Sequence, residues 1–170
     1  MEDNINWIID EKYIDRAHYY RGKIISQFCF LEMTMSMIIT ESFIADRELG
    51  NLMYHTLLER MTFENKRASF QVIIYGRAAE NKTKYKDIFK ELSELNELRN
   101  QFAHYPLIPT IADWDQVTGM GLAKFRDKPN AIRFKVDELE HILARINKLD
   151  YMLNQAFRST ESEKQIQQND

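Results

Sequence analysis

Apolar side chains recur every three or four positions along most of the chain, which is the spacing that buries one face of a helix. The pattern predicts helices over residues 4–20, 23–45, 46–60, 62–80 and 84–103, with a last one from Asp137 to about residue 158. Gly22 is expected to mark a joint between the first two, and Thr62 to cap the fourth. The helix over 23–45 is apolar on more than one face, as expected of a central helix in a bundle.

The period changes between residues 117 and 136. Ile132, Phe134 and Val136 alternate with basic residues, and residues 127–130 (Asp-Lys-Pro-Asn) are turn formers, so a β-hairpin is predicted before the last helix. Asp137 is expected to cap that helix, with Glu140 as its capping-box partner. The fold predicted is all-α, a bundle of about five or six helices with a small β-hairpin insertion. Residues 1–158 are expected to form one domain, and residues 159–170 a flexible polar tail.

Composition narrows the class of protein. The 170 residues are 44% hydrophobic and 29% charged, an ordinary globular balance. Net charge is −3, so a nucleic-acid site must be a local patch. The single cysteine excludes an internal disulfide and a cysteine-cluster metal site. The acidic N-terminus lacks a signal-peptide pattern, and no apolar run reaches the roughly 20 residues of a membrane span, so a soluble cytoplasmic protein is expected.

Candidate chemistry gathers at the end of the helix over 84–103. Asn100 and His104 are four residues apart and therefore share a face, whereas Arg99 points about 140° away from His104. Either the arginine bends around the helix, or the helix loosens before Pro106, or two copies of the helix face each other across a cleft. The simplest reading of the cluster is a helix C-terminus carrying cations, which the helix dipole favours.

The functional reading is cleavage of RNA. An imidazole can take a proton from a ribose 2′-hydroxyl or give one to the leaving 5′-oxygen. A guanidinium matches phosphate oxygens and can stabilise the charge of the pentavalent intermediate, and an amide such as that of Asn100 can orient either group. With the 2′-hydroxyl as the nucleophile, no metal or other cofactor is required.

The segment Arg99-Asn100-Gln101-Phe102-Ala103-His104 resembles the R-N-x-x-x-H form of the motif of the HEPN superfamily. Residues 22–32, with Glu32 embedded, are similar to the early core helix of that family, and residues 58–70 to its second helical unit. The motif helix then comes third and a final helix fourth, in the family's order. The resemblance covers about residues 20–158.

The resemblance implies a helical bundle that dimerises through its motif helices. It implies a metal-independent ribonuclease of toxin–antitoxin or antiviral defence systems, with Arg99 and His104 catalytic, Asn100 as the polar motif residue, and an antitoxin protein as a second partner. Some family toxins carry a tyrosine two residues after the histidine. This chain has Pro106 there and Tyr105 one position earlier, so Tyr105 is a supporting candidate outside that subgroup pattern.

Two further features are open to more than one interpretation. Glu32 lies in an apolar helix and needs a partner: Arg99, another base, or solvent. Residues 77–90 hold five basic residues against two acidic ones, so Lys82, Lys84 and Lys86 could bind an RNA backbone with Tyr75 and Tyr85 stacking on bases, or form an ordinary solvated junction. The rival function is a non-catalytic HEPN-like module that binds RNA or a protein, and a small-ligand-binding bundle is a weaker alternative.

Overall fold

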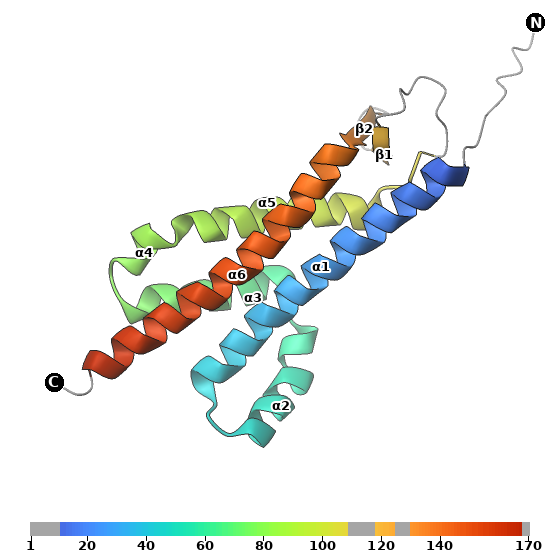
Figure 1. Ribbon diagram of the computed structural model, residues 1–170. Coiled ribbons are helices and arrows are strands. Elements are labelled where there is room, and N and C mark those ends of the chain that lie inside the picture. Colours follow the sequence, from blue (N-terminus) through green and yellow to red (C-terminus); the bar gives the residue numbers. More distant parts are fainter. Residues whose placement is uncertain (1–10, 109–117, 125–129, 168–170) are drawn as a thin grey trace, which may run out of the picture. The chain divides into compact units, whose positions relative to one another are not determined.

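The computed structural model describes residues 11–108, 118–124 and 130–167. Its elements are α1 (Glu11–Phe43), α2 (Arg47–Thr56), a 3-10 turn η1 (Leu58–Arg60), α3 (Phe63–Arg77), α4 (Asn81–Lys84), α5 (Lys86–His104), β1 (Thr118–Lys124), β2 (Asn130–Lys135) and α6 (Val136–Gln167). Figure 1 shows these elements along the chain. The predicted all-α class, with six helices and a two-stranded antiparallel hairpin before the last one, is confirmed.

Two helices are longer than predicted. The expected joint at Gly22 is wrong, because α1 runs through that residue without a break. Its buried side chains keep their helical spacing on both sides of the glycine: Tyr13, Ala17, Tyr20, Ile24, Phe28, Leu31, Met35 and Ile38. The end predicted for α6 is also wrong, since the helix continues from residue 158 to Gln167 through good helix formers such as Glu and Gln. Residues 4–10 of the first predicted helix lie outside the described part of the chain.

The chain forms two compact units. One consists of residues 1–26 and 97–144, and the other of residues 27–96 and 145–170. In the first unit, β1 pairs with β2, with Gly121 opposite Arg133 and Leu122 opposite Ile132. Gly119 permits the hairpin to pack on the start of α6, because a Cβ atom there would lie 2.7 Å from Leu139 Cδ1.

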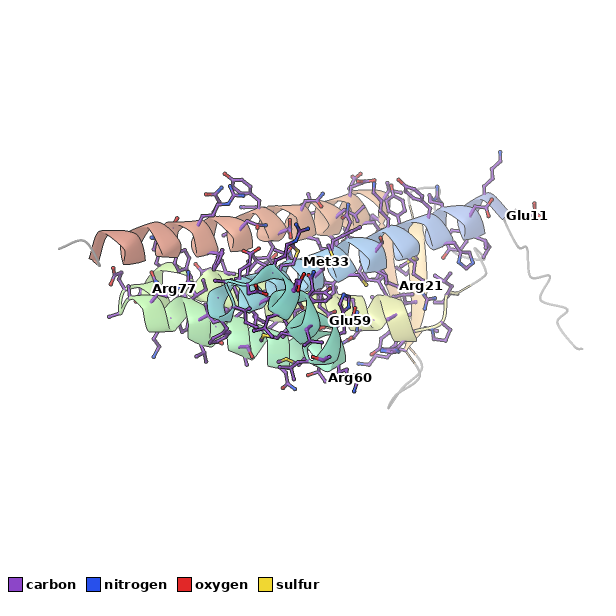
Figure 2. The ribbon with its side chains drawn as sticks, turned by 90° about the horizontal axis from the view of Figure 1, so that it is seen from below. Glu11, Arg21, Met33, Glu59, Arg60 and Arg77 are labelled. Atoms are coloured by element: carbon purple, nitrogen blue, oxygen red, sulfur yellow. The ribbon has the colours of Figure 1, made fainter. Side chains whose placement is uncertain are left out.

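In the second unit, α2 folds back against the last turns of α1 (Figure 1). Gly50 permits the close approach, since a Cβ atom there would lie 3.1 Å from Thr40 Cγ2. Thr62 caps α3 as predicted, accepting a hydrogen bond from the Asn65 N–H at 3.3 Å. At the other end of α3, Arg77 (Figure 2) donates to the Phe157 carbonyl at 3.4 Å and to Ser42 Oγ at 3.3 Å.

The length and apolar character of α1 also meet the criteria for a membrane span. It alone among the described helices does so, with a mean hydropathy of 1.2 over its most apolar window, of which 39% is buried. The core helix of a soluble bundle passes the same test. By its length and composition alone, α1 could therefore span a membrane, contrary to the expectation from the sequence that no apolar run is long enough to do so.

The cap predicted at the start of α6 is displaced by two residues. The helix begins at Val136, and Glu138 Oε2 accepts a hydrogen bond from the Lys135 N–H at 2.7 Å, in place of the expected Asp137 and Glu140. Glu140 instead accepts a hydrogen bond from the Tyr20 hydroxyl at 2.7 Å, which joins α6 to α1 within the first unit.

Because of this hydrogen bond, we expect Tyr20 to ionise at a higher pH than an ordinary tyrosine. The bond to Glu140, followed by burial, raises the pKa of Tyr20 from 10.0 to about 12. Because the neutral hydroxyl is the donor, the contribution to stability is complete below about pH 10 and is lost as the pH rises to about 12. Glu140→Ala is expected to bring the pKa of Tyr20 back toward 10, measured by tyrosinate absorbance during a pH titration. Tyr20→Phe identifies the Tyr20 signal, which is needed because burial also raises the pKa of Tyr13 and Tyr54. A Tyr20 signal that is unchanged in Glu140→Ala would contradict the assignment.

Candidate functional site

One face of α5 forms the wall of an open groove in the first unit. Glu97, Asn100, Gln101 and His104 line it, and their spacing of three, four and seven residues is that of a single helical face. Tyr105, Pro106 and Ala123 complete the lining, and the groove encloses about 610 Å³. Three of the predicted site residues, Asn100, His104 and Tyr105, therefore meet at one groove.

The C-terminal end of α5 is fixed by pairing with the hairpin. α5 ends at His104, as Pro106 dictates, and the chain then runs along β1. The Ala123 N–H donates to the Pro106 carbonyl at 2.9 Å, and the Ile108 N–H donates to the Gly121 carbonyl at 3.0 Å. Leu107 thus bridges to Leu122 across the short ladder. These backbone bonds hold the segment that follows His104 in place at the groove.

Arg21 stabilises the same helix end from α1. Its guanidinium (Figure 2) donates a hydrogen bond to the Ala103 carbonyl at 2.9 Å. Carbonyls in the last turn of a helix lack partners within the helix, and a cation there also complements the helix dipole. The residue next to His104 is therefore anchored by a charged side chain from a distant part of the sequence.

Removing this anchor is expected to loosen the end of α5. Arg21→Ala should lower the free energy of unfolding by about 1–2 kcal/mol, since a hydrogen bond to a charged donor is lost. Urea denaturation measures the change. Lys23→Ala is the control. Lys23 Nζ donates to the exposed Tyr19 hydroxyl at 3.2 Å and lies 5.3 Å from the centre of the same ring, so its removal should leave stability nearly unchanged. Equal midpoints for the two variants would show that the Arg21 bond contributes nothing.

The Arg99 side chain is hydrogen-bonded to that of its sequence neighbour, Asn100. Its Nη1 donates to Asn100 Oδ1 at 3.0 Å, so the guanidinium turns toward the side of α5 on which Asn100 and His104 lie. This contact turns the arginine side chain in the direction that bending around the helix requires, and α5 stays helical as far as His104. The meeting of two copies of the helix across a cleft stays a prediction. Asn100 lines the groove while its side-chain oxygen accepts a hydrogen bond from the guanidinium.

The His104 imidazole is exposed at the groove, and Arg99 and Asn100 are half-buried. An exposed imidazole can exchange protons with a bound molecule, and a guanidinium held by an amide is ready for an anionic group. The site therefore provides a proton carrier and a fixed positive charge on neighbouring turns of one helix.

Glu32 has a partner in the second unit. Lys66 Nζ on α3 donates to Glu32 Oε1 at 2.7 Å, and the two side chains are only 7% and 19% exposed. This is one of the alternatives left open by the sequence, a base other than Arg99. The pairing of Glu32 with Arg99 would join residues of the two units and stays a prediction.

The three predicted RNA-binding lysines are all exposed. Lys82 and Lys84 lie on α4 and Lys86 begins α5, all in the second unit. Lys84 Nζ lies 5.0 Å from the centre of the Tyr85 ring. Tyr85 itself is only 8% exposed, so its ring belongs to the core, which disfavours the interpretation in which it stacks on a base.

Sequence reasoning missed several residues of the site. Glu97 and Gln101 lie at helical spacing from His104, and that spacing alone could have found them. Arg21, Lys66 and Ala123 come from distant parts of the chain, and nothing in the sequence pairs them with α5 or Glu32.

No protein family, curated protein or solved structure matches this chain. Within residues 11–108, 118–124 and 130–167, no three His, Cys, Asp or Glu side chains gather as metal ligands. The chemistry of the groove residues is thus the basis for assigning a function.

Proposed function

We propose that this chain is a metal-independent endoribonuclease of the HEPN type that acts as a dimer. The observation that carries the proposal is the groove on α5, where the exposed His104 lies on one face with Asn100, which in turn holds the Arg99 guanidinium at 3.0 Å. The R-N-x-x-x-H spacing and the helix order that resemble the HEPN superfamily support the same reading. So does the predominantly helical fold, which is the class that the resemblance implies.

In this mechanism the ribose 2′-hydroxyl attacks the adjacent phosphorus, and the His104 imidazole takes the hydroxyl proton. Arg99 stabilises the negative charge that builds up on the phosphorane oxygens. The P–O5′ bond then breaks, and the leaving 5′-oxygen receives a proton from the imidazolium of the partner's motif helix. The products are a 2′,3′-cyclic phosphate and a 5′-hydroxyl, and the step needs no redox partner.

The wider proposal follows the resemblance. A homodimer would bring two motif helices to one cleft, and the enzyme would act in the cytoplasm. The exposed Lys82, Lys84 and Lys86 would bind the RNA backbone. A toxin–antitoxin or antiviral defence role would give it an antitoxin protein as a partner.

The second candidate is a HEPN-like module that binds RNA or a protein without cleaving it. The position of Arg99 favours it, because this half-buried residue is not among the described residues that line the groove. The exposure of His104 in an open groove favours the enzyme instead.

Cleavage of single-stranded RNA in the presence of EDTA tests the proposal. The expected result is cleavage that leaves 2′,3′-cyclic phosphate and 5′-hydroxyl ends, identified by end-specific labelling. A His104→Ala preparation purified in parallel controls for contaminating ribonuclease. Intact RNA across several substrates, in a protein of verified fold and dimeric state, would exclude the enzyme and leave the binding module.

A further inference from the structure

Glu97 stands at the far end of the groove from His104. The two residues are seven positions apart on the same face of α5, which separates them by about 10 Å along the helix axis. Gln101 lies between them, one turn from each. The groove therefore offers a carboxylate and an amide at a fixed distance from the imidazole.

The charge of Glu97 determines what can lie beside it. Among the residues that the structure describes, the exposed Glu97 carboxylate has no hydrogen-bond or ion-pair partner, and the groove lining contains no lysine or arginine. A phosphate next to this carboxylate would be repelled. Neutral groups that donate hydrogen bonds would be attracted, and in single-stranded RNA these are the ribose 2′-hydroxyl, which has one donor, and the edges of the bases.

The two carboxylate oxygens select among the four bases. A carboxylate accepts two parallel hydrogen bonds most readily from two neighbouring N–H donors. On its Watson–Crick edge, guanine places the N1–H and the N2 amino group side by side. The single donors of adenine, cytosine and uracil each lie next to a nitrogen or oxygen acceptor, which would face the second carboxylate oxygen. Gln101, four residues along the same face, can donate its amide N–H to guanine O6.

We propose that Glu97 is a specificity-determining residue that reads a guanine of single-stranded RNA, with Gln101 as its neighbour on the base. This inference rests on the proposed function, since it places a base next to the phosphate that His104 and Arg99 would cleave. Glu97 takes no part in proton transfer to the reacting atoms. Its removal should change which sequence is cleaved more than whether cleavage occurs.

Two oligonucleotides test the recognition of guanine by Glu97 directly. One carries guanosine at the cleavage position and the other inosine, which retains N1–H and O6 but lacks the N2 amino group. The wild-type protein is expected to cleave the guanosine substrate about 10- to 100-fold faster, the range of discrimination expected when one of two paired hydrogen bonds is lost. Glu97→Gln is expected to cleave both at similar rates. Glu80→Gln removes the same charge from an exposed position outside the groove and should keep the wild-type preference.

A guanosine preference that survives in Glu97→Gln, or equal cleavage of the two substrates by the wild type, would overturn the inference. If the wild type cleaves neither, the proposed ribonuclease fails, and binding decides the inference separately. Affinities are then measured by fluorescence anisotropy with the same two oligonucleotides carrying a 2′-deoxy sugar at the cleavage position. Tighter wild-type binding of the guanosine oligonucleotide, lost in Glu97→Gln, supports the inference, and equal affinities overturn it.

Discussion

Replacing His104 with alanine is expected to slow RNA cleavage by about 10²- to 10⁴-fold, the usual contribution of one general acid or base. His104 is the exposed imidazole in the groove, at the last residue of α5. Arg99→Ala should cause a comparable loss through the missing charge on the phosphorane. Rates are measured in EDTA under single-turnover conditions, with circular dichroism and oligomeric state checked for each variant.

His141→Ala is the matched control, because His141 is also an exposed histidine but lies on α6 and does not line the groove. It should retain the wild-type rate. Arg99→Lys keeps the charge but not the planar fork, so it should recover part of the activity lost in Arg99→Ala. Equal rates for the wild type and the His104 and Arg99 alanine variants would place the activity elsewhere or in a contaminant.

Replacing Lys66 with methionine is expected to lower the free energy of unfolding by about 3 kcal/mol or more. Lys66 is almost fully enclosed and donates to Glu32 Oε1 at 2.7 Å. Methionine fills similar space but leaves the Glu32 carboxylate, 19% exposed, without its partner. The cost arises from that unpaired charge more than from the lost contact, and chemical denaturation at neutral pH measures it.

The double variant Glu32→Leu/Lys66→Met separates these causes. Since both charges are removed, it should recover most of the stability lost in Lys66→Met, as replacement of a whole buried pair is often close to neutral. Lys90→Met is the surface control: its pair with Glu94 spans 3.6 Å between side chains that are 76% and 47% exposed, so it should cost at most about 1 kcal/mol. A double variant no more stable than Lys66→Met would mean that packing, not charge, accounts for the loss.

The spacing of apolar residues predicted the order of the helices and of the hairpin, because burying one face of a helix or strand requires apolar residues at regular intervals. It failed at Gly22, where the glycine suggested a joint. The residue occupies an exposed position at which a Cβ atom would meet nothing within 4 Å. Its cost to the helix is about 1 kcal/mol, less than the buried residues on either side contribute. It failed again beyond residue 158, where polar residues of good helix propensity continue α6.

The part of the candidate site that comes from residues close together in the sequence could be predicted. Asn100 and His104 share a face by spacing alone, and the proline after them ends the helix. The partners that fix the site are not local. Arg21 meets Ala103 across 82 positions of sequence, and Lys66 meets Glu32 across 34. Long side chains of like charge are numerous in this sequence, and no pattern distinguishes the one that folding brings to a given carbonyl or carboxylate.

The pairing of residues 106–108 with β1 places the hairpin beside the groove, so substitutions in the hairpin can change the width of the groove. Ala123 on β1 lines the groove opposite residues that belong to α5 and its end, and its small side chain leaves the space open. A larger residue at this one position would narrow the groove without altering any donor or acceptor on α5. Selection or engineering could therefore retune which molecules enter through the hairpin while the helix that carries Arg99, Asn100 and His104 stays unchanged.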